Sequence, residues 1–306
     1  MTVRLVVRRD LPPEDRGAVV DLLNAVADAD GRHALSEHAL LHVRHGDDAG
    51  GSNVLAWDRD ALVGYAHLDE TDGVLGASAE LAVHPAHRRA GVAGQLVGSL
   101  LDIVGDGRLR LWAHGTHPGA ERLAARFGFE QTRVLWQMRR SLGPAIPDAV
   151  LPAGVTVRTF VVGADEAAWT ELNNAAFADH PDQGGWAVSD VEVREAEPWF
   201  DAAGFFLAER AGVLAGFHWT KVHGSRGDHA HEPIGEVYVV GVHPSERGNG
   251  LGAELTLVGL HYLRAGGLAQ VMLYVDESNT AAIRLYQRLG FTRWDTDVTF
   301  SRVIAA

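Results

Sequence analysis

The stretch VGVHPSERGNGLG, residues 240–252, has a counterpart earlier in the chain, LAVHPAHRRAGVA at residues 81–93. In both stretches an apolar run ends at His-Pro, and Arg-x-x-Gly-x-Gly/Ala then opens an amphipathic segment. This order is typical of a strand, a turn and the glycine-rich N-terminus of a helix. Unpaired backbone N–H groups and the positive end of the helix dipole make such a terminus a binding site for phosphate oxygens. The sequence therefore predicts a phosphate-binding unit that is present twice.

The duplication extends beyond this motif. RLAARFGF at residues 122–129 matches RLYQRLGF at 284–291, and LAWDRDALVG at 55–64 matches LAERAGVLAG at 207–216. The two copies are joined by a segment rich in proline and glycine, which is typical of a linker. We therefore predict an N-terminal domain at residues 1–140, a linker at 141–153 and a C-terminal domain at 154–306.

Both copies predict the same order of elements: a strand, two helices, three strands, a helix, a strand, a helix and a last strand. This order indicates the α/β class, with a mixed α+β sheet covered by helices in each of two tandem domains. In the first copy the expected elements are 3–9, 13–29, 36–45, 52–58, 61–69, 74–83, 90–104, 108–113, 117–127 and 130–139. In the second copy they are 155–161, 164–178, 188–198, 204–210, 213–222, 234–242, 249–265, 270–275, 279–289 and 292–303.

The composition is that of a globular protein, with 46% hydrophobic and 22% charged residues among 306. A net charge of −13 argues against nucleic acid as a partner, because binding a phosphate backbone needs a basic face. No apolar run reaches the roughly 18 residues of a membrane span. The N-terminal residues have the pattern of a strand, not of a signal peptide. We expect a monomeric, cytoplasmic protein with no membrane partner, acting on a small molecule.

The chain contains no cysteine and only one lysine, Lys221. The absence of cysteine excludes disulfides, zinc–thiolate sites and a cysteine nucleophile. Lys221 does not stand in a Gly-Lys-Ser/Thr sequence, which excludes a P-loop. The 16 histidines show no spacing typical of metal ligands, so we expect no metal site.

An alternative interpretation of the glycine-rich turn is a dinucleotide site. The segment from Gly248 to Ala253 fits G-x-G-x-x-G/A, and Asp276 follows the next strand as a ribose-binding acid would. However, His-Pro-Ser-Glu-Arg separates the first glycine from the strand, and the first copy has Arg89 in its place. The two copies share the pattern Arg-x-x-Gly-x-Gly/Ala, and the dinucleotide interpretation does not explain the arginine in it.

The shared motif, His-Pro followed by Arg-x-x-Gly-x-Gly/Ala, has a hairpin before it and a strand and a helix ending in Gly-Phe after it. This arrangement resembles the GCN5-related N-acetyltransferases (GNATs). The resemblance covers both copies and implies that the turn holds the pyrophosphate of acetyl-CoA. In the second copy the implied acetyl-CoA contacts are Val240, Gly241, Val242, Arg247, Gly248, Asn249, Gly250, Leu251, Gly252, Ala253, Asn279, Thr280, Ala281, Ala282, Ile283 and Arg284. In the first copy they are Leu81, Ala82, Val83, Arg88, Arg89, Ala90, Gly91, Val92, Ala93 and Gly94.

The two copies differ in the groups that could move protons. Acetyl transfer to an amine needs a base for the ammonium, a polarised thioester carbonyl and an acid for the departing thiolate. In the second copy, Glu236 in an apolar strand is the candidate base, and Tyr286 on the last helix is the candidate acid. The first copy has Ala77 and Ala124 at these positions. We therefore expect catalysis in the second copy, by direct attack within a ternary complex, while the first copy binds CoA or acts as a scaffold.

Four stretches of the second copy resemble tandem-domain GNATs that acetylate the cysteine amine of a cysteinyl-glucosaminyl-inositol, a thiol pseudo-disaccharide. These stretches are residues 173–186, 219–223, 235–242 and 273–286. Asp182 stands where those proteins have glutamate, and the sequence around Glu37 matches them poorly. The resemblance implies substrate contacts at Glu37, Asp182, Lys221, Glu236 and Tyr274.

Two other functions remain open at this point. The chain could acetylate another amine, such as an aminoglycoside, a polyamine or a protein N-terminus. It could also be an acyl-CoA sensor that binds CoA without turnover, although Glu236 and Tyr286 argue against this.

Overall fold

The computed structural model of the protein describes residues 3–45, 51–72, 75–115, 117–178, 185–224 and 233–305. The chain forms two compact units. Unit 1 comprises residues 1–135 and 295–306, and unit 2 comprises residues 136–294. Among the helices of the described ranges, none is both long enough and apolar enough to cross a membrane.

Unit 1 contains a mixed sheet with the strand order β1-β2-β3-β4-β5-β12-β6, in which β4 and β5 are parallel. Apolar side chains of α1 and α2 pack with Leu55 and Tyr65 on one face, and those of α3 pack with Val54 and Ala66 on the other. Its elements are β1 (Arg4–Arg8), α1 (Pro13–Asp30), α2 (Glu37–His45), β2 (Gly51–Asp58), β3 (Ala61–Asp69), β4 (Ala77–Val83), η1 (Pro85–His87), α3 (Val92–Val104), β5 (Gly107–Ala113) and α4 (Pro118–Arg126).

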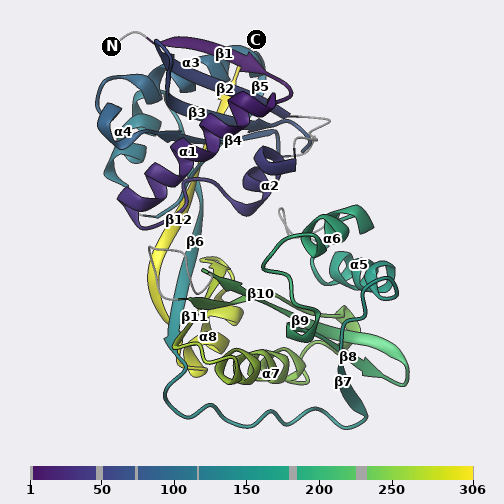
Figure 1. Ribbon diagram of the computed structural model, residues 1–306. Coiled ribbons are helices and arrows are strands. Elements are labelled where there is room, and N and C mark those ends of the chain that lie inside the picture. Colours follow the sequence, from purple (N-terminus) through teal and green to yellow (C-terminus); the bar gives the residue numbers. More distant parts are fainter. Residues whose placement is uncertain are drawn as a thin grey trace. The chain divides into compact units, whose positions relative to one another are not determined.

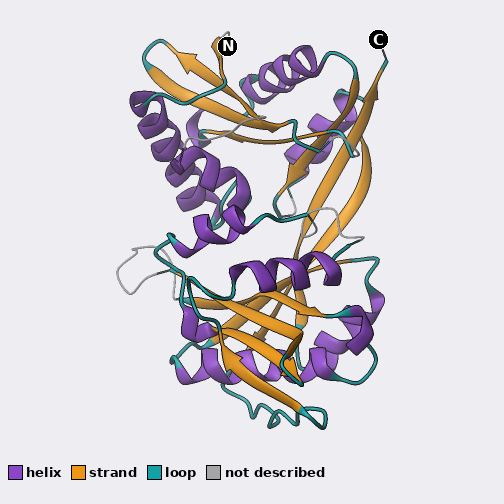
Figure 2. Ribbon diagram, turned by 90° about the vertical axis from the view of Figure 1, so that its right-hand side faces the viewer, coloured by secondary structure: helices purple, strands orange, loops and turns teal. Residues whose placement is uncertain are grey.

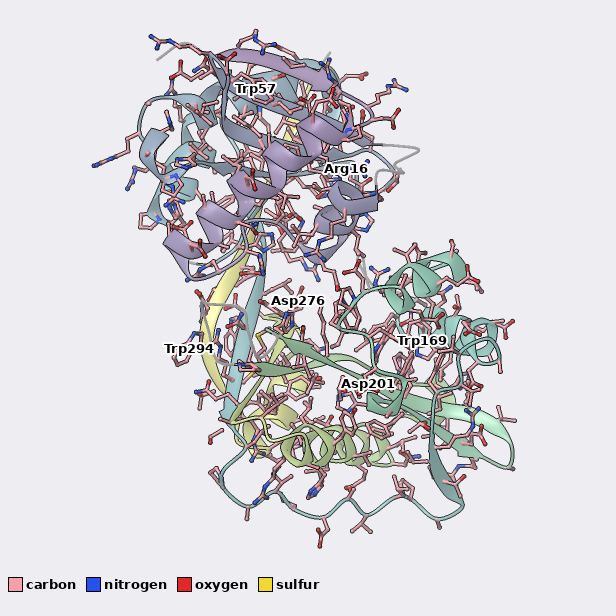
Figure 3. All side chains as sticks on the ribbon, in the orientation of Figure 1. Arg16, Trp57, Trp169, Asp201, Asp276 and Trp294 are labelled. Carbon is pink, nitrogen blue, oxygen red and sulfur yellow. The ribbon has the colours of Figure 1, made fainter. Side chains whose placement is uncertain are left out.

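Unit 2 repeats this plan with the strand order β12-β6-β11-β10-β9-β8-β7. On one face of its sheet, Trp169 of α5 is fully buried against the rings of Phe205, Phe217 and Trp219 (Figure 3). The other face packs against α7 and α8. Its elements are β7 (Val155–Thr159), α5 (Glu166–Ala176), α6 (Val188–Glu195), η2 (Ala202–Gly204), β8 (Phe205–Arg210), β9 (Val213–His223), β10 (Ile234–Val242), η3 (Pro244–Glu246), α7 (Leu251–Ala265), β11 (Gln270–Asp276) and α8 (Thr280–Arg288).

The predicted α/β class and the predicted order of elements are confirmed in both copies. Figure 2 shows helices on both faces of the strands in each unit, as the alternation of helices and strands requires. The observed boundaries differ from the predicted ones by a few residues. The largest differences are at the start of β4, which begins at Ala77 and not at the predicted residue 74, and at the end of α6, which ends at Glu195 and not at the predicted residue 198.

The two long strands β6 (Glu130–Ser141) and β12 (Thr292–Ile304) each contribute to both units and are neighbours in the sheet (Figure 1). Val298–Ile304 of β12 pairs antiparallel with β5, so the end of the second copy completes the sheet of the first. The unit boundaries therefore differ from the predicted domains, since residues 295–306 belong to unit 1 and 136–140 to unit 2. An apolar strand pattern indicates that a strand is paired, but it does not indicate with which strand.

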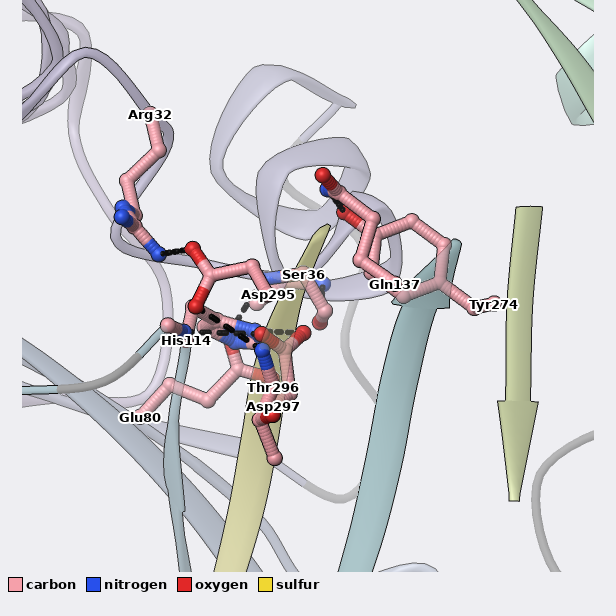
Figure 4. Close-up of polar contacts among 11 residues, drawn as sticks. Arg32, Ser36, Glu80, His114, Gln137, Tyr274, Asp295, Thr296 and Asp297 are labelled. Atoms are coloured by element: carbon pink, nitrogen blue, oxygen red, sulfur yellow. Dashed lines mark hydrogen bonds and ion pairs between the residues drawn. The ribbon is translucent and has the colours of Figure 1, made fainter. Parts of the chain in front are cut away.

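A buried ionic cluster links the separated ends of β4 and β5 in unit 1 (Figure 4). His114 lies just after β5. Its Nε2 is 3.4 Å from Oε2 of Glu80 in β4, and its Nδ1 is 3.0 Å from Oδ2 of Asp297 in β12. Glu80 also accepts a hydrogen bond from the N–H of Ser36, and Asp297 accepts one from Gly115. Burial disfavours the imidazolium, but the two carboxylates outweigh this effect and raise the pKa of His114 to about 10. His114 is therefore charged at neutral pH and holds the sheet ends together.

We expect His114→Gln to remove a pH-dependent part of the stability of unit 1. The pKa of His114 is about 10 when folded and about 6.5 when unfolded, so its contribution is complete below pH 6.5 and disappears as the pH rises to 10. At pH 6.5 the variant should be less stable than the wild type by about 4 kcal/mol. Urea unfolding at several pH values checks this. A difference between the two proteins that stays constant from pH 6.5 to 10 would contradict it.

Candidate active site

In unit 2, the parallel strands β10 and β11 separate soon after they begin. Their pairing joins Gly235 to Val271 and Glu236 to Met272, and in the described part of the chain it goes no further. On the β11 side, the backbone of Val240–Val242 is therefore open to an extended ligand. This is the place where the sequence predicts three of the acetyl-CoA contacts.

A β-bulge lies in β10 at the point where the two strands separate. Val237 lies opposite Thr220 and Val239 opposite Trp219, so Tyr238 is an extra residue in β10. A bulge bends a strand and changes the direction of its side chains. The corresponding pairing of β3 with β4 in unit 1 is regular. The bulge is thus a feature of the second copy, and the sequence analysis did not predict it.

The glycine-rich turn of unit 2 follows β10 directly. His243 accepts a hydrogen bond at Nδ1 from the N–H of Ser245 at 3.2 Å, which caps the short turn η3. Gly248 and Gly250 have φ values of +84° and +89°, in the left-handed region that favours glycine. In the described ranges, no hydrogen bond uses the N–H groups of Gly248, Gly250 or Gly252. N–H groups without an intramolecular partner at the start of a helix have a geometry that suits an anion.

The turn of unit 1 keeps the same backbone. His84 accepts a hydrogen bond from the N–H of Ala86 at 3.3 Å, as His243 does in its own turn. Gly91 has a φ of +87°, and Arg89 has a φ of +59° where the second copy has glycine. A non-glycine residue in this region costs roughly 1 kcal/mol. The left-handed conformation is therefore a property of both turns, even where the sequence lacks the glycine.

The motif arginines of the two turns have different partners. Arg88 of unit 1 donates two hydrogen bonds of 2.7 Å to the carboxylate of Asp30, and this ion pair neutralises its charge. Arg247 of unit 2 donates to the backbone oxygen of Ala176 at 2.7 Å, at the C-terminal end of α5. A carbonyl does not neutralise a guanidinium, and within the described ranges no carboxylate forms an ion pair with Arg247 beside the turn. The second turn is therefore the more attractive one for an anion.

Glu236 and Lys221 are direct neighbours across β10 and β9. Both are buried, with 7% of each residue exposed. Oε2 of Glu236 also lies 2.5 Å from Nε2 of His223, two residues further along β9 on the same face. Three groups able to carry charge therefore meet on one face of the sheet, beside the opening between β10 and β11.

Aromatic rings form a wall next to these groups. Nζ of Lys221 lies 4.2 Å from the ring centroid of Trp199 and 5.2 Å from that of Tyr238. Arg194 of α6 donates a hydrogen bond of 2.8 Å to the hydroxyl of Tyr238, and its guanidinium lies 4.1 Å from the ring centroid of Trp186. The face of an aromatic ring attracts a cation. The wall fixes Tyr238, the bulge residue, from both sides.

The candidate acid lies on α8. Tyr286 is buried and its ring centroid is 5.8 Å from that of Phe291. Burial raises the pKa of Tyr286 to about 12, so the phenol keeps its proton at neutral pH. Asn279 caps this helix, because its Oδ1 accepts a hydrogen bond of 3.1 Å from the N–H of Ala282. The predicted contacts from Thr280 to Arg284 form the first turns of the same helix.

The remaining predicted substrate contacts are spread over the chain. Tyr274 of β11 is 42% exposed, and its hydroxyl accepts a hydrogen bond of 2.7 Å from Nε2 of Gln137 (Figure 4). Glu37 lies in the first turn of α2, in unit 1. Asp182 lies outside the described residues. Of the predicted substrate contacts, the structure therefore places Glu236 and Lys221 next to each other. It also places His223 beside Glu236, and the sequence analysis did not assign His223 to the site.

Glu236 and Tyr286 lie on opposite faces of the sheet of unit 2. Tyr286 packs with Val237 in the core on the side of α7, and residues alternate between faces along a strand. Glu236 therefore points to the other face, where Lys221 and Tyr238 lie. A carboxylate on one side and a phenol on the other are suited to accept and donate a proton at a reacting group held between the strands.

Comparison with known proteins identifies related chains. The model of the acetyltransferase (GNAT) family matches residues 19–129 and 168–291. The chain is 53% identical to the mycothiol acetyltransferase of Streptosporangium roseum, over 99% of this chain and 100% of the other. It is 55% identical to the mycothiol acetyltransferase of Thermobispora bispora, again over 99% and 100%.

Solved structures show the same arrangement of elements. A GCN5-related N-acetyltransferase from Sphaerobacter thermophilus is 26% identical, with a TM-score of 0.69 over 99% of this chain and 96% of the other. A tandem GNAT protein from the clavulanic acid biosynthesis pathway has a TM-score of 0.73 over 99% of each chain. Its identity is 20%, so this second likeness concerns the fold alone.

Proposed function

The chain belongs to the acetyltransferase (GNAT) family and, within it, to the mycothiol acetyltransferases, and from this premise we propose that it acetylates the cysteine amine of desacetylmycothiol. This acceptor is a cysteinyl-glucosaminyl-inositol, the acetyl donor is acetyl-CoA, and the product is mycothiol. The observation that supports the proposal most lies within unit 2, where a turn whose N–H groups have no partner among the described residues stands next to separated strands and a buried carboxylate.

The acetyl-CoA would lie along the second copy. The N–H groups of Gly248, Gly250 and Gly252 and the charge of Arg247 suit its pyrophosphate. The open backbone of Val240–Val242 suits the amide-containing arm between the pyrophosphate and the sulfur. In the first copy the turn backbone is the same, so we propose that it binds a second CoA or serves as a scaffold, without catalysis.

The transfer itself needs three proton movements. Glu236 accepts a proton from the acceptor ammonium, and the freed amine nitrogen then attacks the thioester carbon. Backbone N–H groups of Val240–Val242 stabilise the charge on the carbonyl oxygen. The carbon–sulfur bond breaks, and Tyr286 gives its proton to the departing sulfur, which leaves as the thiol of CoA. The attacking nitrogen then loses its second proton through solvent to the phenolate of Tyr286, which restores the phenol and leaves the neutral amide. Because the chain has no cysteine, the acetyl group passes directly from sulfur to nitrogen, and positioning supplies much of the rate.

The acceptor would be held by the groups around Glu236. Lys221 can donate hydrogen bonds to a hydroxyl or carbonyl oxygen, and the half-exposed Tyr274 offers a phenol on β11. Glu37 and Asp182 are included through the resemblance to related sequences. Carboxylates suit both an ammonium group and sugar hydroxyls, which fits an amino-acylated pseudo-disaccharide.

Incubation with acetyl-CoA and desacetylmycothiol should give CoA and an acceptor that carries one acetyl group, measured by chromatography with mass detection. The acetyl group should resist neutral hydroxylamine, which cleaves a thioester but leaves an amide intact, so transfer to nitrogen is distinguished from transfer to sulfur. Glucosaminyl-inositol, which lacks the cysteine, should not be acetylated.

The same assay discriminates between the other functions. Turnover with a polyamine or an aminoglycoside, but none with desacetylmycothiol, would refute the acceptor assignment and leave an acetyltransferase for another amine. Binding of acetyl-CoA without turnover on any of these amines would favour the acyl-CoA sensor.

A further inference from the structure

His223 contacts the candidate base directly but has no assigned role. Its Nε2 lies 2.5 Å from Oε2 of Glu236. The side chain of Glu236 is 9% exposed, whereas that of His223 is 32% exposed. The imidazole thus joins a buried carboxylate to solvent.

We propose that His223 is a positioning residue that holds one carboxylate oxygen of Glu236, so that the other oxygen faces the acceptor amine. This proposal rests on the proposed function, because it gives a role to a residue through Glu236. With Nε2–H as donor, His223 occupies Oε2, and only Oε1 remains to take the ammonium proton. A carboxylate that rotated freely would present its basic oxygen to the amine only part of the time.

The surroundings of the pair make His223 the group that fixes this orientation. On β9, Lys221 lies opposite Glu236, but its ammonium group lies over the rings of Trp199 and Tyr238. From α6, Arg194 is directed to the hydroxyl of Tyr238. On the β11 side, the register partner of Glu236 is Met272, which carries no charge.

The opposite face of the sheet offers no polar contact to this pair in the described residues. A Cβ atom added at Gly235 would contact the side chains of Leu263 and Leu268 on that face, and Val237 packs into the apolar core there. Among the residues that the structure describes, the charged and titratable groups that face Glu236 and His223 are therefore Lys221, Tyr238 and Arg194. In the described part of the chain, the side-chain hydrogen bond of the Glu236 carboxylate is the one with His223.

The test compares His223→Ala and His223→Gln with the wild type. His223→Ala should lower kcat by about 10- to 100-fold and leave the KM for acetyl-CoA nearly unchanged, because only the orientation of the base is lost. His223→Gln keeps an N–H donor of similar reach but cannot be protonated. It should restore kcat to within about fivefold at pH 8 and leave the KM for acetyl-CoA nearly unchanged.

A matched control is His261→Ala. His261 is a half-buried histidine on α7 of the same unit, hydrogen-bonded to the backbone oxygen of Pro147 at 2.9 Å. It does not contact Glu236, so its loss should leave the pH–rate profile as in the wild type. This control separates the loss of any hydrogen-bonded histidine from the loss of this one.

Two results would overturn the positioning role. One is a His223→Ala variant with wild-type kcat between pH 6 and 9. The other is equal loss of kcat and of acetyl-CoA affinity in both variants together with a lower melting temperature, which would indicate a structural histidine. A wild type that acetylates no amine would refute the proposed function and the positioning role together, whereas an active wild type with an indifferent His223 refutes only the latter.

Discussion

Glu236→Gln should lower kcat by about 10²- to 10⁴-fold, the range expected when a general base is removed. The amide has the size of the carboxylate and can still accept a hydrogen bond from His223, so the fold around β10 should persist. It cannot take the ammonium proton. The KM for acetyl-CoA should remain within about twofold of the wild type, because the turn that holds the pyrophosphate is not changed.

A matched control for this variant is Glu254→Gln. Glu254 is another hydrogen-bonded glutamate of unit 2, on α7, and accepts a hydrogen bond from the N–H of Val150. Its replacement should leave kcat within about twofold. If Glu236→Gln reduced kcat and acetyl-CoA affinity by the same factor, Glu236 would have a structural role and the assignment of the base would be wrong.

Local patterns in the sequence predicted most of the fold. Period-two and helical periodicities, together with the repeat, gave the order of strands and helices in both copies. The turn was predictable because the His and Gly residues of the motif each have a local cause that the structure displays. His84 and His243 cap a short turn, and Gly91 and Gly250 have positive φ at a helix start.

Features that depend on contacts between distant segments were not predicted. The pairing of β12 with β5 joins residues almost 200 positions apart, and nothing in the pattern of β12 specifies that partner. The bulge at Tyr238 depends on the register between β9 and β10, and the cluster of Glu80, His114 and Asp297 depends on the pairing of β12. His223 could have been found, since it follows Lys221 by two residues on a strand and so shares its face.

The candidate site shows the same division between local and distant causes. The sequence predicted Glu236 and Lys221 separately, and the register of β9 with β10 makes them neighbours. The sequence could not indicate that Asp30 neutralises Arg88 while Arg247 binds a carbonyl oxygen, because these partners lie far away in the chain. This difference adds a structural reason to the expectation that the second copy carries the chemistry.

Replacement of a turn glycine tests which copy carries the chemistry. Gly91 and Gly250 have φ values of +87° and +89°, and an added Cβ would meet no atom within 4 Å at either position. Valine should therefore act at both sites through backbone strain of roughly 1–3 kcal/mol, not through a clash. A turn that relaxes this strain no longer directs its N–H groups at the pyrophosphate, and each such charge-assisted hydrogen bond contributes about 1.5–3 kcal/mol.

The most direct measurement is kcat/KM for acetyl-CoA, at saturating acceptor, in the wild type, Gly91→Val and Gly250→Val, with melting temperatures as a check on folding. The account predicts a loss of about 100-fold for Gly250→Val and a value within about threefold of the wild type for Gly91→Val. A large loss in Gly91→Val, with Gly250→Val close to the wild type, would place the reaction in the first copy and contradict the account.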